Sequence, residues 1–242
     1  MISIVKAEVQ KTRHSMQRSF LVLFPLVTLS LAALLTLGMV NSYAESVWNW
    51  WDLLLLPGMI AILCNLSVSQ EKKTGFYHLQ MLPTDKKRLM LGKIIYLSIA
   101  IFASNVMIFA GSTCGGRLLT THVPVKGAAM AVIVLTIAKL WSVPVCLFLC
   151  DKFGLIVELC VYLALSVAGG LIAQTDNWYL LVSAVSSRML CPLIYVQPNG
   201  LPVEAGSILL DTGVLLPGIS ISALWFVILT VMFLHYFEKR EA

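Results

Sequence analysis

The sequence predicts an all-α, polytopic membrane protein, and two observations lead to this fold class. The first is composition: of 242 residues, 59% are hydrophobic and only 12% are charged, with a mean hydropathy of +0.88. A soluble domain cannot bury so much apolar surface in one core. The second is that apolar residues form runs of about 20, the length at which a helix crosses a hydrocarbon layer of about 30 Å. A membrane β-barrel would instead alternate apolar and polar residues in strands of about 10.

Six such runs predict six transmembrane helices in a single domain that covers residues 1–242. We expect them at residues 20–40, 53–69, 91–112, 127–149, 154–173 and 214–237. Residues 1–19 are predicted to form an amphipathic helix on the membrane surface, although a basic flank of the first span fits the sequence equally well. A cleaved signal peptide fits less well, because the first apolar run is long for a signal core.

Between the second and third spans, residues 70–83 are predicted to form a short cytoplasmic helix. Pro83 ends this segment, because proline cannot continue a helical hydrogen-bond ladder. Thr84 or Asp85 is expected to cap the third span, since both side chains accept hydrogen bonds from the free N–H groups at a helix start.

Residues 174–213 are too apolar for an ordinary loop, yet polar residues interrupt them. These residues are Ser183, Ser186, Ser187 and Arg188. We expect two short re-entrant half-helices that break near Arg188 to Pro192, with their free backbone groups against protein or water. A solvent-exposed loop with apolar patches is the alternative.

The basic residues predict that both termini are cytoplasmic, because cytoplasmic loops are enriched in Lys and Arg. Thirteen of the 17 basic residues fall in the N-terminal segment, the loop after the second span, the turn after the fourth span and the C-terminal tail. Topology and contact with anionic lipid therefore explain the net charge of +5. The charge does not predict nucleic-acid binding.

Two ionisable residues fall inside predicted spans, Lys139 near the middle of the fourth and Glu158 one turn inside the fifth. A charge in lipid costs at least about 2.5–3.5 kcal/mol, so each must face protein or water. Because the two spans follow each other, we expect an ion pair between Lys139 and Glu158. A role in a translocation path and separate solvation are the alternatives.

Aromatic residues mark the outer ends of the predicted spans. Trp48, Trp50, Trp51 and Trp178 suit the interface between headgroups and acyl chains, where an amphiphilic ligand would also lie. They are candidate ligand-facing residues, and an anchor belt without a ligand is the alternative.

The six cysteines are scattered and predict no metal centre. Cys146 and Cys150 share a helix face but lack two further ligands nearby, so apolar packing is favoured. Cys114 and Cys191 are predicted near the outer side, and the sequence leaves open whether they form a disulfide.

The polar segment carries a family resemblance. The pattern Glu71, Gly75, Leu79 and Pro83, followed by Gly92–Lys93 at the start of the third span, resembles the cytoplasmic coupling loop of six-helix ABC exporter permeases. Further motifs narrow the resemblance to the small permeases that protect lantibiotic producers from their own peptide. These motifs are Phe24-Pro25-Leu26, Trp50-Trp51 before a Leu-rich Pro-Gly span, and Leu82-Pro83.

The resemblance implies that this segment docks onto a separate ATPase. Positions 71, 75, 79 and 83 are spaced by four and fall close to one helical stripe. On this stripe Gly75 leaves room for close approach, and Glu71 reaches a basic or backbone donor of the partner. Phe76, Leu79 and Leu82 would fill an apolar cleft on the ATPase.

The chain is expected to be a non-catalytic transport subunit without a cofactor or metal of its own. It contains no Gly-x-x-x-x-Gly-Lys-Ser/Thr phosphate loop and no soluble segment long enough to fold a nucleotide-binding domain. The resemblance implies that ATP and Mg bind a partner ABC ATPase, present in two copies. It also implies a second six-helix permease, identical or related.

We therefore expect a multi-pass protein of the bacterial cell membrane that expels an amphiphilic antimicrobial peptide, a lantibiotic, and so confers immunity. One alternative is an ABC exporter of a lipid or of a small amphiphilic drug. The other is a motor-free immunity protein that sequesters the peptide stoichiometrically.

Overall fold

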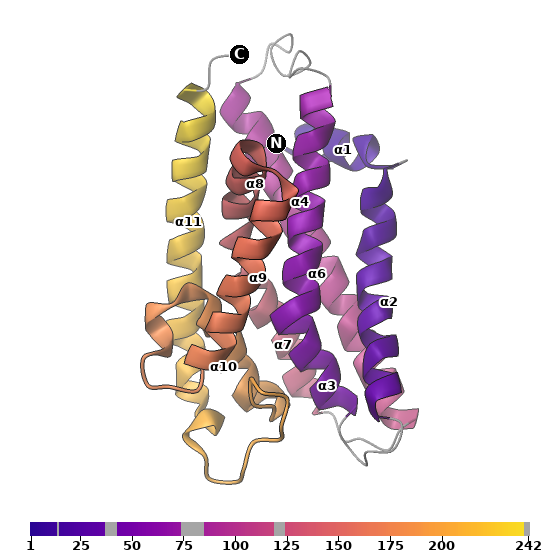
Figure 1. Cartoon of the computed structure of the whole chain (residues 1–242), viewed down its shortest axis with the longest axis vertical. Coiled ribbons are helices and arrows are strands. Elements are labelled where there is room, and N and C mark those ends of the chain that lie inside the picture. Colours follow the sequence, from indigo (N-terminus) through magenta and orange to yellow (C-terminus); the bar gives the residue numbers. More distant parts are fainter. Residues whose placement is uncertain (14, 37–42, 74–84, 119–123, 240–242) are drawn as a thin grey trace.

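The computed structural model describes residues 1–13, 15–36, 43–73, 85–118 and 124–239. These residues form a bundle of long helices joined by turns, with one isolated β-bridge (Figure 1). Five helices in the described part of the chain are long and apolar enough to cross a membrane, or six if a bent pair counts as one span. The prediction of an all-α protein with several spans is confirmed.

The helices follow one another in a simple order. The first are α1 (Ile2–Lys11), α2 (Met16–Thr36), α3 (Tyr43–Trp50), the π-helical turn η1 (Trp51–Leu55) and α4 (Leu56–Lys73). The next are α6 (Lys86–Leu118), α7 (Val125–Lys139), α8 (Ser142–Phe153) and α9 (Leu155–Ile172). The last are α10 (Val182–Ile194) and α11 (Leu215–Lys239), with short 3₁₀ turns at Trp178–Leu180, Ile208–Leu210 and Thr212–Val214.

Four predicted spans correspond to single helices with shifted ends. Residues 20–40, 91–112, 154–173 and 214–237 match α2, α6, α9 and α11 respectively, although residues 37–40 lie outside the described residues. The predicted surface helix at 1–19 is shorter, because α1 ends at Lys11 and α2 already begins at Met16. The Asp85 side chain accepts a hydrogen bond from the Lys87 N–H at 3.0 Å, which confirms Asp85 as a cap of α6.

The second predicted span, 53–69, begins too late. One continuous helical path runs from Tyr43 to Lys73 through α3, η1 and α4. The prediction started the span at the Leu-rich run and placed Trp48 and Trp51 at the membrane interface. The structure buries Asp52, Trp48 and Trp51 inside the bundle instead.

The fourth predicted span, 127–149, is broken into α7 and α8, which are bent by 42°. Pro144 lies in the first turn of α8 and has no N–H to give to the carbonyl four residues earlier. The Val143 N–H donates a hydrogen bond to the Leu140 carbonyl at 3.1 Å, and the Ser142 hydroxyl donates one to the Lys139 carbonyl at 2.6 Å. The freed carbonyl groups at the bend are thus satisfied inside the protein, as a membrane requires.

The segment 174–213 contains one helix, α10, rather than two half-helices that break near Arg188. α10 runs without interruption from Val182 to Ile194 and includes Pro192. It ends at Tyr195, whose left-handed backbone (φ 62°) accounts for the stop. Every residue from Ser183 to Ile194 is buried, so the expectation of a solvent-exposed loop also fails here.

Close backbone packing holds α10 in the bundle. A Cβ atom at Gly127 of α7 would lie 2.1 Å from the Leu193 carbonyl oxygen, and one at Gly169 of α9 would lie 2.6 Å from the backbone of Ser183. Glycine is therefore required at both contacts. α10 also packs against α11.

The two ends of the bundle differ (Figure 1). α1, the end of α4, the start of α6 and the end of α11 lie at one end, which we call the terminal end. α10 and the following turns lie toward the other, the opposite end. α1 and the C-terminal end of α11 thus lie at the same end of the bundle. That this end faces the cytoplasm stays a prediction.

Candidate functional site

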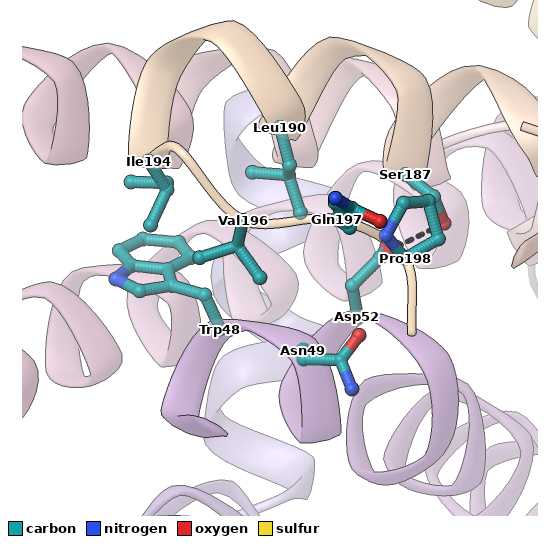
Figure 2. Close-up of a pocket in the computed structure, with 9 residues that line it drawn as sticks. All are labelled: Trp48, Asn49, Asp52, Ser187, Leu190, Ile194, Val196, Gln197 and Pro198. Carbon is teal, nitrogen blue, oxygen red and sulfur yellow. Dashed lines mark hydrogen bonds between the residues drawn. The ribbon is translucent and has the colours of Figure 1, made fainter. Parts of the chain in front are cut away.

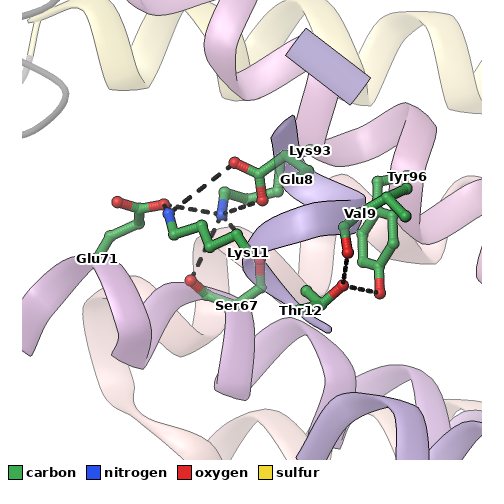
Figure 3. A network of polar contacts seen from close by, with 8 residues as sticks. All are labelled: Glu8, Val9, Lys11, Thr12, Ser67, Glu71, Lys93 and Tyr96. Atoms are coloured by element: carbon green, nitrogen blue, oxygen red, sulfur yellow. Dashed lines mark hydrogen bonds and ion pairs between the residues drawn. The ribbon is translucent and has the colours of Figure 1, made fainter. Parts of the chain in front are cut away.

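A cluster of charged side chains joins three helices at the terminal end (Figure 3). Its centre is Lys93 of α6, whose ammonium lies 3.1 Å from a Glu71 oxygen of α4 and 3.4 Å from a Glu8 oxygen of α1. Lys93 also donates to the Ser67 hydroxyl at 2.9 Å. Lys11 of α1 donates to the same Glu71 oxygen. We call Glu8, Lys11, Glu71 and Lys93 the terminal cluster.

The terminal cluster is electrically balanced, and its central pair is buried. Two lysines face two glutamates, and the side chains of Lys93 and Glu71 are each 2% exposed. Removing Lys93 or Glu71 would leave an uncompensated buried charge, which typically costs about 3–5 kcal/mol. The cluster therefore fixes α1, α4 and α6 to one another.

Two further contacts bind α1 to α6. The Tyr96 hydroxyl of α6 donates to the Thr12 hydroxyl at 2.9 Å, and Thr12 donates in turn to the Val9 carbonyl. Gly92 lets Ile4 lie directly on α6, because a Cβ atom there would be 2.5 Å from the Ile4 side chain. The helix predicted to lie on the membrane surface is thus held against the bundle.

Glu71 is placed differently from the sequence-based expectation. It was expected to reach a donor on a partner, but its carboxylate lies inside the chain against Lys11 and Lys93. It stands two residues before the end of α4, at the base of the predicted coupling segment. The other predicted coupling residues lie outside the described residues; they are Gly75, Phe76, Leu79, Leu82 and Pro83.

A neighbouring ion pair connects α4 to the bent span. Lys72 lies 3.5 Å from an Asp151 carboxylate oxygen of α8 and donates to the Asp151 carbonyl at 2.6 Å. A rotation of the end of α4 would therefore act on α8 as well as on α1 and α6.

A second buried cluster lies deeper in the bundle. The Lys139 ammonium of α7 lies 2.9 Å from an Asp52 carboxylate oxygen, and both side chains are at most 2% exposed. The other Asp52 oxygen accepts from the Ser187 hydroxyl of α10 at 2.6 Å. We call Asp52, Lys139 and Ser187 the central cluster. The predicted ion pair between Lys139 and Glu158 is wrong, because Lys139 pairs with Asp52.

The π-helical turn explains why Lys139 also binds the Asp52 backbone. In η1 the Leu56 N–H donates to the Trp51 carbonyl, five residues back. The next donor in this pattern would be residue 57, which is proline and has no N–H. The Asp52 carbonyl is therefore free for side chains, and it accepts from Lys139 at 3.0 Å and from the Ser166 hydroxyl at 3.5 Å.

The predicted ligand-facing tryptophans divide into two groups. Trp48 and Trp51 belong to the core, at 1% and 0% exposed, so their prediction as surface residues is wrong. The Trp51 indole N–H donates to the Asn105 side chain at 2.7 Å, and Asn105 donates to the Thr136 hydroxyl at 2.9 Å. Trp50 is 38% exposed.

Trp178 is partly exposed and lies edge-on to Tyr179, with ring centroids 6.2 Å apart. For Trp50 and Trp178 a role toward an amphiphilic ligand stays a prediction.

A small void adjoins the central cluster (Figure 2). It has a volume of about 10 Å³ and is lined by residues that include Trp48, Asp52 and Ser187. This space is about that of one water molecule. The central cluster thus has no room for a peptide or a drug in this state of the protein.

Glu158 is fully buried in α9, and neither carboxyl oxygen makes a hydrogen bond within the described part of the chain. The thiols of Cys146 and Cys150 are among its polar neighbours. Its burial agrees with the expectation that it faces protein.

Sequence reasoning missed three buried charged residues. Asp52 stands one residue before the predicted second span and Lys93 at the start of the predicted third span, so neither was expected inside the bundle. Arg188 was taken as the site of a helix break, yet it is 4% exposed and donates to the Ile208 carbonyl at 2.9 Å. The i, i+3 spacing of Lys93 and Tyr96 on α6 was the signal that could have identified the face that binds α1.

The cysteines are free thiols, including Cys114, which is exposed, and Cys191, which is buried. The disulfide that the sequence left open is thus not formed. Among the described residues no group of three or more His, Cys, Asp or Glu side chains could hold a metal ion.

Comparison of the chain with protein-family models, with curated proteins and with solved structures finds no match. The resemblance to lantibiotic immunity permeases therefore rests on the motifs of the sequence.

Proposed function

We propose that the chain is the membrane-spanning permease subunit of an ABC transporter in the bacterial cell membrane. The transporter expels an amphiphilic antimicrobial peptide, a lantibiotic, and so confers immunity. A separate ABC ATPase in two copies binds ATP and Mg, and a second six-helix permease completes the pathway.

The observation that carries the proposal is the position of the terminal cluster. Glu71 lies two residues before the end of α4, and the predicted coupling residues Gly75 to Pro83 follow it in the sequence. A force applied by an ATPase to that segment reaches Glu71 first. Because Glu71 is bound to Lys11 and Lys93, movement of α4 also moves α1 and α6.

The central cluster supports a switch between two arrangements of the spans. It joins η1, α7 and α10 through charged and hydroxyl groups rather than through apolar packing alone. Buried polar groups have discrete partners, so they favour a small number of defined packings. Alternating rearrangement of two six-helix halves requires such defined states.

A resistance assay tests the proposal. Cells that express the chain with its partner ATPase are expected to survive the peptide, and an ATPase variant that cannot hydrolyse ATP is expected to abolish survival. Persistent protection with the inactive ATPase would mean stoichiometric sequestration and would overturn the mechanism. If the transporter exports a lipid or a small drug but not the peptide, that molecule is the substrate and the proposed peptide substrate is wrong.

Gly75→Trp tests the predicted docking segment independently of the inactive ATPase variant. This change is expected to abolish co-purification with the ATPase while leaving membrane insertion intact. The matched control Lys126→Trp, at an exposed residue in the first turn of α7, is expected to change neither. Normal resistance in Gly75→Trp would contradict the docking role.

A further inference from the structure

An apolar groove opens between α8, α9 and α11. Its cavity volume is about 420 Å³, within the range of about 300–1,000 Å³ that is typical of ligand pockets. The lining includes Phe148 of α8, Val161 of α9, and Leu229, Met232 and Tyr236 of α11. The Tyr236 hydroxyl donates to the Asp151 carboxylate at 3.3 Å, which leaves the ring as the part that lines the groove.

The groove lies in the half of the bundle near the terminal end. Tyr236 is three residues from the end of α11, and Phe148 lies in the second half of α8. From Tyr236 to Leu229 the groove follows α11 for about 10 Å, roughly a third of a hydrocarbon layer of about 30 Å. The upper part of a lipid acyl chain occupies this depth.

The ammonium group of Lys152 lies beside Phe148, which lines the groove. The Lys152 ammonium lies 5.8 Å from the centroid of the Phe148 ring and 5.9 Å from that of Phe153. Lys152 is exposed, and none of the salt bridges among the described residues involves it. Its neighbour Lys72 is the residue that pairs with Asp151. Lys152 thus offers an unpaired positive charge at the level of the headgroups.

The length of the groove and the charge beside it distinguish a lipid from a partner helix. The groove follows α11 for only about 10 Å, whereas a membrane-spanning partner helix would run along about 30 Å of it. A single acyl chain is far thinner than a helix. An anionic phosphate complements the Lys152 charge, with a contribution typical of a basic residue at an anionic surface.

We propose that this groove is a binding site for an anionic phospholipid from the leaflet at the terminal end. One acyl chain lies between α8, α9 and α11, and the phosphate contacts Lys152. The inference is independent of the proposed transport function, because it rests on the groove and the cation alone.

Photolabelling in lipid nanodiscs tests this site with the full chain. The probes are phosphatidylglycerol and phosphatidylcholine, each with a photoreactive group on one acyl chain, and mass spectrometry maps the adducts. We expect adducts at Leu229 and Met232, with more from phosphatidylglycerol than from phosphatidylcholine. Lys152→Gln is expected to lower this preference about fivefold, and Leu229→Trp, which fills the groove, is expected to reduce adducts from both lipids.

Two control variants complete the experiment. Lys126→Gln removes a cation in the first turn of α7, which does not line the groove. Leu224→Trp adds the same bulk at a residue of α11 that is 61% exposed. Both are expected to leave labelling of the groove unchanged. Equal labelling by the two lipids, an unaltered preference in Lys152→Gln, or adducts spread evenly over α11 would overturn the proposal.

Discussion

Lys139 and Asp52 form an ion pair inside the bundle, and each depends on the other. Their partnership explains how a charge on α7 is tolerated, because the 2.9 Å contact and the hydroxyl of Ser187 replace water. The sequence showed that Lys139 needed a partner inside the protein. It did not show which one, because Asp52 stands just before the apolar run that was predicted as the second span.

Lys139→Met tests the pairing directly. The change leaves the Asp52 carboxylate buried without an opposite charge, and we expect the free energy of unfolding to fall by about 3–5 kcal/mol. Thermal unfolding in detergent, followed by tryptophan fluorescence, measures the effect. Lys126→Met, at an exposed lysine, is the control.

A second substitution identifies the partner. We expect Asp52→Asn to recover much of the loss in the Lys139→Met background, because it removes the unpaired charge. If Glu158→Gln restored the stability and Asp52→Asn did not, Lys139 would pair with Glu158, contrary to the structure.

The adjacent residues Trp50 and Trp51 differ in role, and substitution of each by phenylalanine distinguishes the two roles. Trp51→Phe keeps an aromatic ring but leaves the buried Asn105 oxygen without its donor, so we expect a loss of about 1–3 kcal/mol in the free energy of unfolding. Trp50→Phe, at a residue that is 38% exposed, is expected to change it by no more than about 0.5 kcal/mol. Similar effects of the two changes would contradict the assignment of Trp51 to the core.

Among the helices, α1 has the least expected position. Its amphipathic pattern was compatible with the membrane surface, but a pattern does not reveal a partner face. The contacts that hold it come from Lys93 and Tyr96 on α6 and from Glu71 on α4, residues more than 50 positions away in the sequence. Such distant contacts cannot be read from the local spacing of apolar residues.

The attachment of α1 predicts a change in hydrogen exchange. Glu71→Gln removes the negative charge that faces Lys11 and Lys93, and hydrogen bonds to charged groups typically contribute about 1.5–3 kcal/mol. We expect amide exchange in residues 2–11 to accelerate by about tenfold or more, as measured by mass spectrometry. Lys6→Gln, on the exposed side of α1, is expected to have no effect, and unchanged exchange in Glu71→Gln would show that α1 is held by other contacts.

The bent pair α7 and α8 illustrates a different reason why prediction from the sequence was incomplete. Composition identified residues 127–149 correctly as one apolar stretch, and Pro144 was visible in it. Whether a proline only loosens a turn or redirects the helix depends on which groups satisfy the freed carbonyls. Ser142 and the Val143 N–H do so here, and the bend reaches 42°.

Taken as a whole, the molecule buries several charged residues within its apolar core and exposes large apolar side chains. Its buried residues include Asp52, Lys93, Lys139 and Glu158, whereas large apolar side chains of α2, α9 and α11 are exposed. In water this arrangement would be unstable, but in lipid the apolar faces need no cover. Composition and run length therefore predicted the class of the fold well. The arrangement of the helices depends on a few buried polar contacts, which composition does not encode.

The account as a whole depends on mechanical coupling between the terminal end and an ATPase. Peptide-stimulated ATP hydrolysis by the purified complex in lipid nanodiscs measures this coupling most directly. We expect the peptide to raise hydrolysis in the wild-type complex and Glu71→Gln to abolish that rise, with the ATPase still bound and Lys126→Gln behaving as the wild type. Full stimulation in Glu71→Gln, or hydrolysis that does not respond to the peptide in any variant, would contradict the account.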